Sequence, residues 1–130
     1  MVTIAGAFLA DVIVPKTAKQ QLFNPKWPPH AKFHNGQTIA LSILLGVVCL
    51  YLLFRTEGDQ RFQFILAVVI ASYFWLSMIL ATLFPNTHWV DEEFITDSKS
   101  IWGLYPQQFL AYTMILLLLV GFVLGFLPMW

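Results

Sequence analysis

The sequence predicts an all-α integral membrane protein, a four-helix bundle with a shortened first helix and a long, ordered first loop. Hydrophobic residues make up 58% of its 130 residues, against about 45–50% in soluble domains. Charged residues make up only 11%, which is too few to hydrate the large relative surface of a small soluble domain. Three uncharged segments also reach the roughly 20 residues that a helix needs to cross a bilayer.

We expect these segments to be spanning helices over about 36–54, 62–84 and 105–127, within a single transmembrane domain covering 1–130. Pro85 follows the second segment and is expected to end its helix. Pro106 lies in the first turn of the third helix, where its missing N–H group costs nothing.

Residues 1–14 form the expected first helix. At 1.5 Å per residue it is about 21 Å long, which is less than a hydrocarbon core of about 30 Å. One interpretation is a shortened helix packed against its neighbours, and the other is an interfacial or re-entrant stub. Four helices bury an inner face better than three, which favours the shortened helix.

Loops 15–37 and 85–100 lie on the same side of the membrane because two spans separate them. The first loop is basic and the second is mainly acidic, so we expect them to dock. The lysine and arginine count predicts that this side is cytoplasmic. A net charge of zero gives no reason to expect nucleic acid as a partner. The charged residues of the two loops are Lys16, Lys19, Lys26 and Lys32, then Asp91, Glu92, Glu93, Asp97 and Lys99.

The stretch 27–37, WPPHAKFHNGQ, carries the most specific chemistry. Its two prolines favour a helix that starts near Pro28. On a helix, His30 and His34 point the same way and can bind one metal ion. With His88 or a carboxylate, they would suit Zn or non-haem Fe. The alternatives are that these histidines bond to loop backbone and lipid head groups, or act as acid, base or ligand-orienting groups.

Asp11 lies late in the first apolar segment. An acid at membrane depth usually faces a polar cavity or a cation. Near a helix end it can instead reach the interface and pair with Lys16 or Lys19. The adjacent acids that include Glu92 are more typical of a solvated face than of an active site.

Few polar residues interrupt the three spans, and none of them is charged. This argues against an ion pump or a charge-coupled transporter, which need charged residues at depth. Gly121 and Gly125 form a G-x-x-x-G pattern in the third span. This spacing lets another helix approach closely, so we expect contact with another transmembrane subunit or a second copy of the chain.

The WPPHAKFHNGQ stretch, preceded by Phe23-Asn24-Pro25, resembles the signature of a small, uncharacterised integral membrane family. Asp11 and the pattern from Pro85 to Asp91-Glu92-Glu93-Phe94 resemble it too. The resemblance implies a four-helix protein with the histidine motif after its first helix, and it emphasises His30 and His34. Some members carry an acetyltransferase label, but the resemblance implies no established reaction.

Two functional hypotheses follow, and the sequence does not decide whether the protein is an enzyme. In the first, a pocket open at the loop side binds, and as an enzyme would transform, a small lipophilic molecule. His30, His34 and Asp11 would then be the catalytic residues, and the ligand would contact Trp27, Asn35, His88 and Glu92. In the second, the protein is a non-catalytic accessory subunit of a larger membrane complex.

Overall fold

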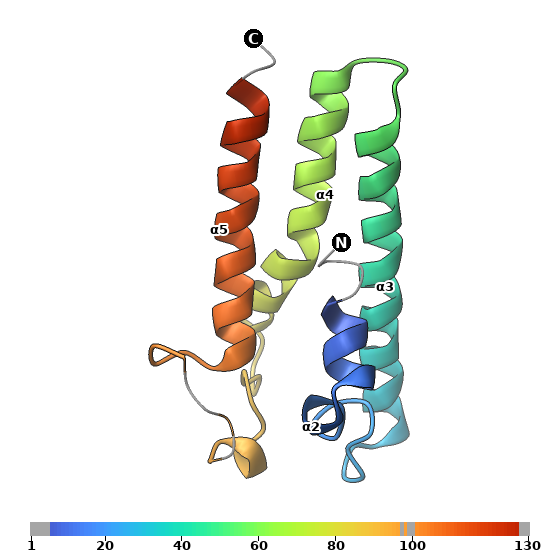
Figure 1. Ribbon diagram of the computed structural model, residues 1–130. Coiled ribbons are helices and arrows are strands. Elements are labelled where there is room, and N and C mark those ends of the chain that lie inside the picture. Colours follow the sequence, from blue (N-terminus) through green and yellow to red (C-terminus); the bar gives the residue numbers. More distant parts are fainter. Residues whose placement is uncertain (1–5, 97, 99–100, 128–130) are drawn as a thin grey trace.

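A computed structural model of the chain describes residues 6–96, 98 and 101–127 (Figure 1). The described residues form helices joined by turns and short loops. Residues 6–8 are α-helical and continue directly into a π-helix, η1. The named elements are η1 (Leu9–Ile13), α2 (Pro15–Ala18), α3 (Pro29–Phe54), α4 (Gln60–Ala81), η2 (Glu92–Phe94) and α5 (Pro106–Phe126).

Helices α3, α4 and α5 are long and apolar enough to cross a membrane. Proline occupies the first turn of α3 and of α5, where its fixed φ favours a helix start. Helix α4 begins differently, because the Asp59 side chain accepts hydrogen bonds from the backbone N–H groups of Arg61 and Phe62. This N-cap supplies partners for two N–H groups that the helix itself leaves unpaired.

Helix α3 starts at Pro29, earlier than the expected start at 36. Pro28 is extended and Pro29 opens the helix, and residues 30–37, most of which are not apolar, then continue it without a break. A hydropathy pattern detects only the apolar part of such a helix. The first loop is correspondingly shorter than the expected 15–37. Helix α4 ends at Ala81 instead of 84, and turns follow it.

The described part of the expected first helix covers residues 6–13, and residues 1–5 lie outside the described residues. At 1.5 Å per residue these residues span about 12 Å, less than half of a 30 Å hydrocarbon core. The segment lies beside the loop-proximal half of α3 (Figure 1). We call residues 6–13 the half-helix. The described structure therefore contains three candidate spans and one half-length helical segment.

Helix α4 is the centre of the fold, since it packs against both α3 and α5. The half-helix adds Ala7 to a core that joins all three spans. Trp75 of α4 is 1% exposed at the middle of this core. The other core residues are Ile39, Phe74 and Ala111. The core therefore lies where the half-helix meets the three spans.

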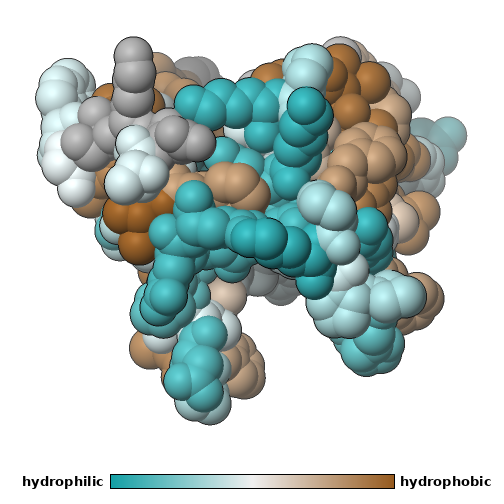
Figure 2. Space-filling model, turned by 90° about the horizontal axis from the view of Figure 1, so that it is seen from below, coloured by the Kyte–Doolittle hydropathy of each residue, from teal (hydrophilic) through white to brown (hydrophobic). Residues whose placement is uncertain are grey.

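Hydrophilic side chains gather over the end of the molecule that carries the longer loops (Figure 2). At this end, Lys26 pairs with Glu93, which joins the two oppositely charged loops. Asp97 and Lys99, which contributed to the expected loop charge, lie outside the described residues. The loop end is therefore a polar cap over three apolar helices.

Candidate functional site

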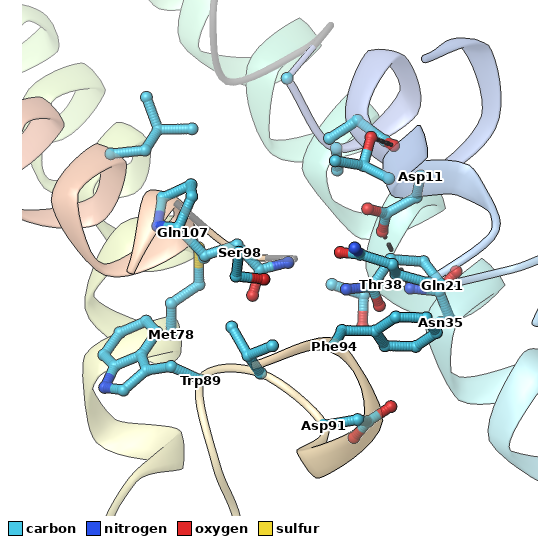
Figure 3. Close-up of a pocket in the computed structure, with 18 of the residues that line it drawn as sticks. Asp11, Gln21, Asn35, Thr38, Met78, Trp89, Asp91, Phe94, Ser98 and Gln107 are labelled. Atoms are coloured by element: carbon cyan, nitrogen blue, oxygen red, sulfur yellow. Dashed lines mark hydrogen bonds between the residues drawn. The ribbon is translucent and has the colours of Figure 1, made fainter. Parts of the chain in front are cut away.

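A cavity of about 370 Å³ lies at the loop end of the molecule (Figure 3). The half-helix and the start of α3 form one side of it, and the loop after α4 and the start of α5 face them. Its polar lining includes Asp11, Thr17, Gln20, Gln21, Asn35 and Thr38. Its apolar lining includes Phe74, Trp75, Met78, Trp89, Phe94 and Leu110. The cavity thus has a polar wall and a largely apolar wall.

The polar wall centres on a hydrogen bond between Asp11 and Asn35. The Asn35 Nδ2 atom donates to Asp11 Oδ2 at 2.9 Å and so ties the half-helix to α3. The Asn35 Oδ1 atom is buried and has no hydrogen-bond partner among the described residues. Buried polar atoms are rarely left unpaired in native structures. The polar wall therefore contains a buried acceptor whose hydrogen-bonding capacity is unused.

Local backbone structure holds Asp11 in this position. Asp11 lies in η1, whose wider turn ends when the N–H of Val14 donates to the Leu9 carbonyl at 2.8 Å. The Thr17 hydroxyl of α2 then donates to the Ala10 carbonyl. Single turns of π-helix occur frequently at functional sites. The half-helix is thus closed by one bond from Val14 and one from Thr17 of α2, and Asp11 is bonded to Asn35 of α3.

The Asp11 carboxyl group lies outside the three candidate spans and is 9% exposed. Burial raises the pKa of Asp11 above its usual value, because removing water disfavours the charged form. The hydrogen bond from Asn35 partly opposes this rise, since it stabilises the carboxylate. A carboxyl group with a perturbed pKa in a cleft is a candidate functional group.

Hydrogen bonds and an ion pair join the two loops beside the cavity. Trp27 Nε1 donates to Asp91 Oδ2 at 3.2 Å, and both residues line the cavity. Asn24, which is 1% exposed, donates to Glu93 at 3.4 Å and accepts from the Lys26 backbone N–H at 2.9 Å. The hydrogen bond from Lys26 lowers the pKa of Glu93. We call these five residues the loop contact.

Aromatic packing shapes the apolar wall. Phe74 and Trp75 meet edge to face with their ring centroids 5.0 Å apart. Trp89 packs in the same manner against Tyr112 of α5, at 6.5 Å. Such pairs fix ring orientations, so this side of the cavity is preformed.

His30 and His34 lie on α3 but are not among the residues that line the cavity. Both are exposed, and their Nε2 atoms are 3.1 Å apart. The expected i, i+4 juxtaposition on a helix is therefore present, but it faces away from the site that contains Asp11. Among the described residues, no group of three or more His, Cys, Asp or Glu side chains is arranged to hold a metal ion.

The structure gathers some of the residues expected at the site and separates others. Asp11, Trp27, Asn35 and His88 line one cavity. Glu92, in η2, is exposed and does not line it. The cavity lining also includes three residues that were not expected at the site from the sequence, namely Gln21, Thr38 and Phe94. For Thr38 a signal existed, because it lies one helical turn after Asn35.

No curated protein and no solved structure matches this chain. A family model does match it, over residues 1–127. The match covers nearly the whole chain and agrees with the resemblance to an uncharacterised family. The chain belongs to the family of unknown function DUF6640.

Proposed function

We propose that the cavity binds the polar end of a small lipophilic molecule that carries a hydrogen-bond donor. The observation that supports this most directly is the buried, unpaired Asn35 Oδ1 atom in the polar wall. An unpaired buried acceptor costs about 1–3 kcal/mol. A hydroxyl, amine or ammonium group of a ligand would donate to it and remove that cost.

Asp11 strengthens the preference for a donor. Its Oδ2 atom already accepts from Asn35, and a carboxylate has further acceptor capacity on its second oxygen. The acceptors of both side chains therefore belong to one wall of the cavity, which is formed by the half-helix and α3. A hydroxyl or amine fits this pair, whereas a ligand carboxylate or phosphate would face like charge.

The opposite wall suits the apolar part of the same molecule. Phe74, Trp75, Met78 and Leu110 line it, and the cavity volume lies within the range of about 300–1,000 Å³ that is common for small-molecule sites. A ligand with one polar end and an apolar body would bury each part against the matching wall. This is the chemistry of a long-chain alcohol or amine.

Within this proposal Asp11 is the group placed for proton transfer to or from the polar end of the ligand. His88 lines the same cavity and is a second candidate. His30 and His34 have no part in this site. The half-helix is the shortened fourth member of the bundle, and the loop end faces the cytoplasm, as the lysine and arginine count suggests.

The proposal can be tested with a photoreactive long-chain alcohol and its methyl ether, which lacks the donor, on the purified protein in lipid nanodiscs. We expect saturable labelling of cavity residues by the alcohol and much weaker labelling by the ether. Asn35→Leu should reduce labelling by the alcohol about tenfold, which corresponds to roughly 1.4 kcal/mol. His34→Ala, next to Asn35 on the exposed face, is the matched control and should label normally. Equal labelling by alcohol and ether, or loss in His34→Ala alone, would refute the proposal.

A groove favours a second candidate function, that of an accessory subunit. It has a volume of about 380 Å³ and lies along α4 between α3 and α5. Small residues, Gly46, Ala67, Ala71 and Gly121, line part of it, and small residues allow close packing of transmembrane helices. Gentle extraction followed by size analysis tests this function. A chain found only in a large assembly supports the subunit, and a chain recovered alone argues against it.

A further inference from the structure

The exposed face of α3 carries a second cluster of functional groups, separate from the cavity. His30 and His34 lie in the first turns of this helix with both rings exposed. Their Nε2 atoms are 3.1 Å apart and the ring planes are inclined by 78°. Two imidazoles with converging Nε2 atoms have the arrangement that a metal ion needs from two ligands.

A third side chain sets the tautomer of His34. The His34 Nδ1 atom lies 3.1 Å from Gln37 Oε1. With the Gln37 amide oxygen as the acceptor, Nδ1 carries the proton and Nε2 carries the lone pair. Metal-binding histidines typically use their second ring nitrogen in this way, and the bond orients the ring and makes it a better ligand.

We propose that His30 and His34 bind one divalent transition-metal ion through their Nε2 atoms, with Gln37 as the positioning residue. With metal–nitrogen bonds of about 2.05 Å, the 3.1 Å separation subtends an angle of about 98° at the metal. This value lies between the right angle of square-planar or octahedral sites and the tetrahedral angle. The separation of the two nitrogen atoms is therefore compatible with two bonds to one metal ion.

The ligand type restricts the metal. Imidazole suits Zn²⁺, Cu²⁺ and Ni²⁺, whereas non-haem iron sites add a carboxylate. The part of the chain that the structure describes places no third His, Cys, Asp or Glu in a group with this pair. The remaining coordination positions are therefore open to water, and the ion is exchangeable. The pair is a surface site for Zn²⁺ or Cu²⁺, not a closed structural site.

The competing interpretation of the same geometry is a plain hydrogen bond, in which His30 Nε2–H donates to His34 Nε2. The two interpretations differ in their response to added metal. If the contact is only a hydrogen bond, metal ions have no saturable site here. If the pair is a metal site, the His30 proton moves to its other nitrogen and the ion takes its place.

Titration of metal-free protein, purified without a polyhistidine tag, decides between them. Co²⁺ is the probe for visible absorption, and Zn²⁺ is the probe for calorimetry. We expect one equivalent to bind, and we expect His30→Ala and His34→Ala each to abolish binding. His88→Ala is the control and should bind normally. Circular dichroism should show unchanged helix content in every variant, since both histidines are exposed.

Gln37→Leu tests the positioning role separately, because it keeps both ligands. We expect it to weaken Zn²⁺ binding about 10- to 100-fold, as removal of a hydrogen-bond partner of a metal-bound histidine typically does. Unchanged affinity in Gln37→Leu would remove Gln37 from the proposal. Absence of saturable binding in the wild type, or its persistence in His30→Ala, would overturn the metal site itself.

Discussion

Gly125 of α5 offers the sharpest test of the helix packing. A Cβ atom added there would lie 2.5 Å from Phe64 Cζ and 3.1 Å from Phe64 Cε2, on α4. Carbon atoms pack best at about 3.5–4.0 Å, so the Phe64 ring would have to move by roughly 1 Å. The ring also stacks on Phe122 with centroids 6.2 Å apart, and this contact opposes the movement. Overpacking of this kind typically costs about 1–3 kcal/mol.

Gly121 is the matched control, because it lies on the same helix and has nothing within 4 Å of an added Cβ. Replacing either glycine with alanine improves helix propensity by up to about 1 kcal/mol. This gain is common to both variants and cancels in their difference. Gly125→Ala should therefore be less stable than Gly121→Ala by about 1–3 kcal/mol. The free energies of unfolding would be compared by reversible denaturation in mixed micelles.

The double variant Gly125→Ala/Phe64→Leu checks the cause, since a smaller side chain on α4 relieves the clash. We expect it to recover part of the loss. Equal stability of the two alanine variants would refute the packing of α5 on α4 described here. If both variants instead reduced association between copies without affecting stability, the glycines would serve an interface between chains.

Three further predictions concern single side chains. Asp59→Ala removes the cap of α4 and should lower the free energy of unfolding by about 1 kcal/mol. Asp11→Asn keeps an acceptor for Asn35 but removes the carboxyl group. Because the pKa of this group is raised in the folded wild type, the wild type loses stability as the pH rises above the usual value of 3.8. The variant should therefore melt at a higher temperature than the wild type at pH 7 and show a smaller change with pH. Glu93 has a lowered pKa because of Lys26, so its contribution exists above the usual value of 4.5 and disappears as the pH falls through the lower folded value. Melting curves at several pH values should show that Glu93→Gln removes this acid-side dependence.

The three spans could be predicted from the sequence because bilayer thickness translates directly into the length of an apolar run. The start of α3 could not be predicted from hydropathy, since residues 30–37 are helical although most of them are not apolar. The helix start that Pro28 favours was a better prediction of this boundary than hydropathy was. The position of the half-helix was harder still to predict from the sequence. It depends on Ala7 packing in a core with residues of three other helices, which no local pattern encodes.

At the candidate site, residue spacing along a helix predicts which side chains are neighbours, but not which direction they face. The spacing of His30 and His34 correctly placed them side by side, but it did not say which way they face. The buried positions of α3 are Ile39, Ser42, Gly46 and Cys49. Extending this series by one turn toward the N-terminus gives Asn35, on the inner face. His34 is offset from Asn35 by about 100°, which directs it away from the cavity.

The half-length first segment explains why the groove along α4 stays open. Helix α4 packs on both α3 and α5, while these two make few contacts with each other, so a furrow runs along α4 between them. A full-length fourth helix would fill this furrow from end to end. The half-helix enters it only near the loops, where Ala7 closes the core and Asp11 meets Asn35. The cavity lies at this loop end, between the half-helix and α3 on one side and the loop after α4 and the start of α5 on the other. Lengthening the half-helix would therefore leave the cavity in place, whereas replacing Ala10 with a large apolar residue would fill it.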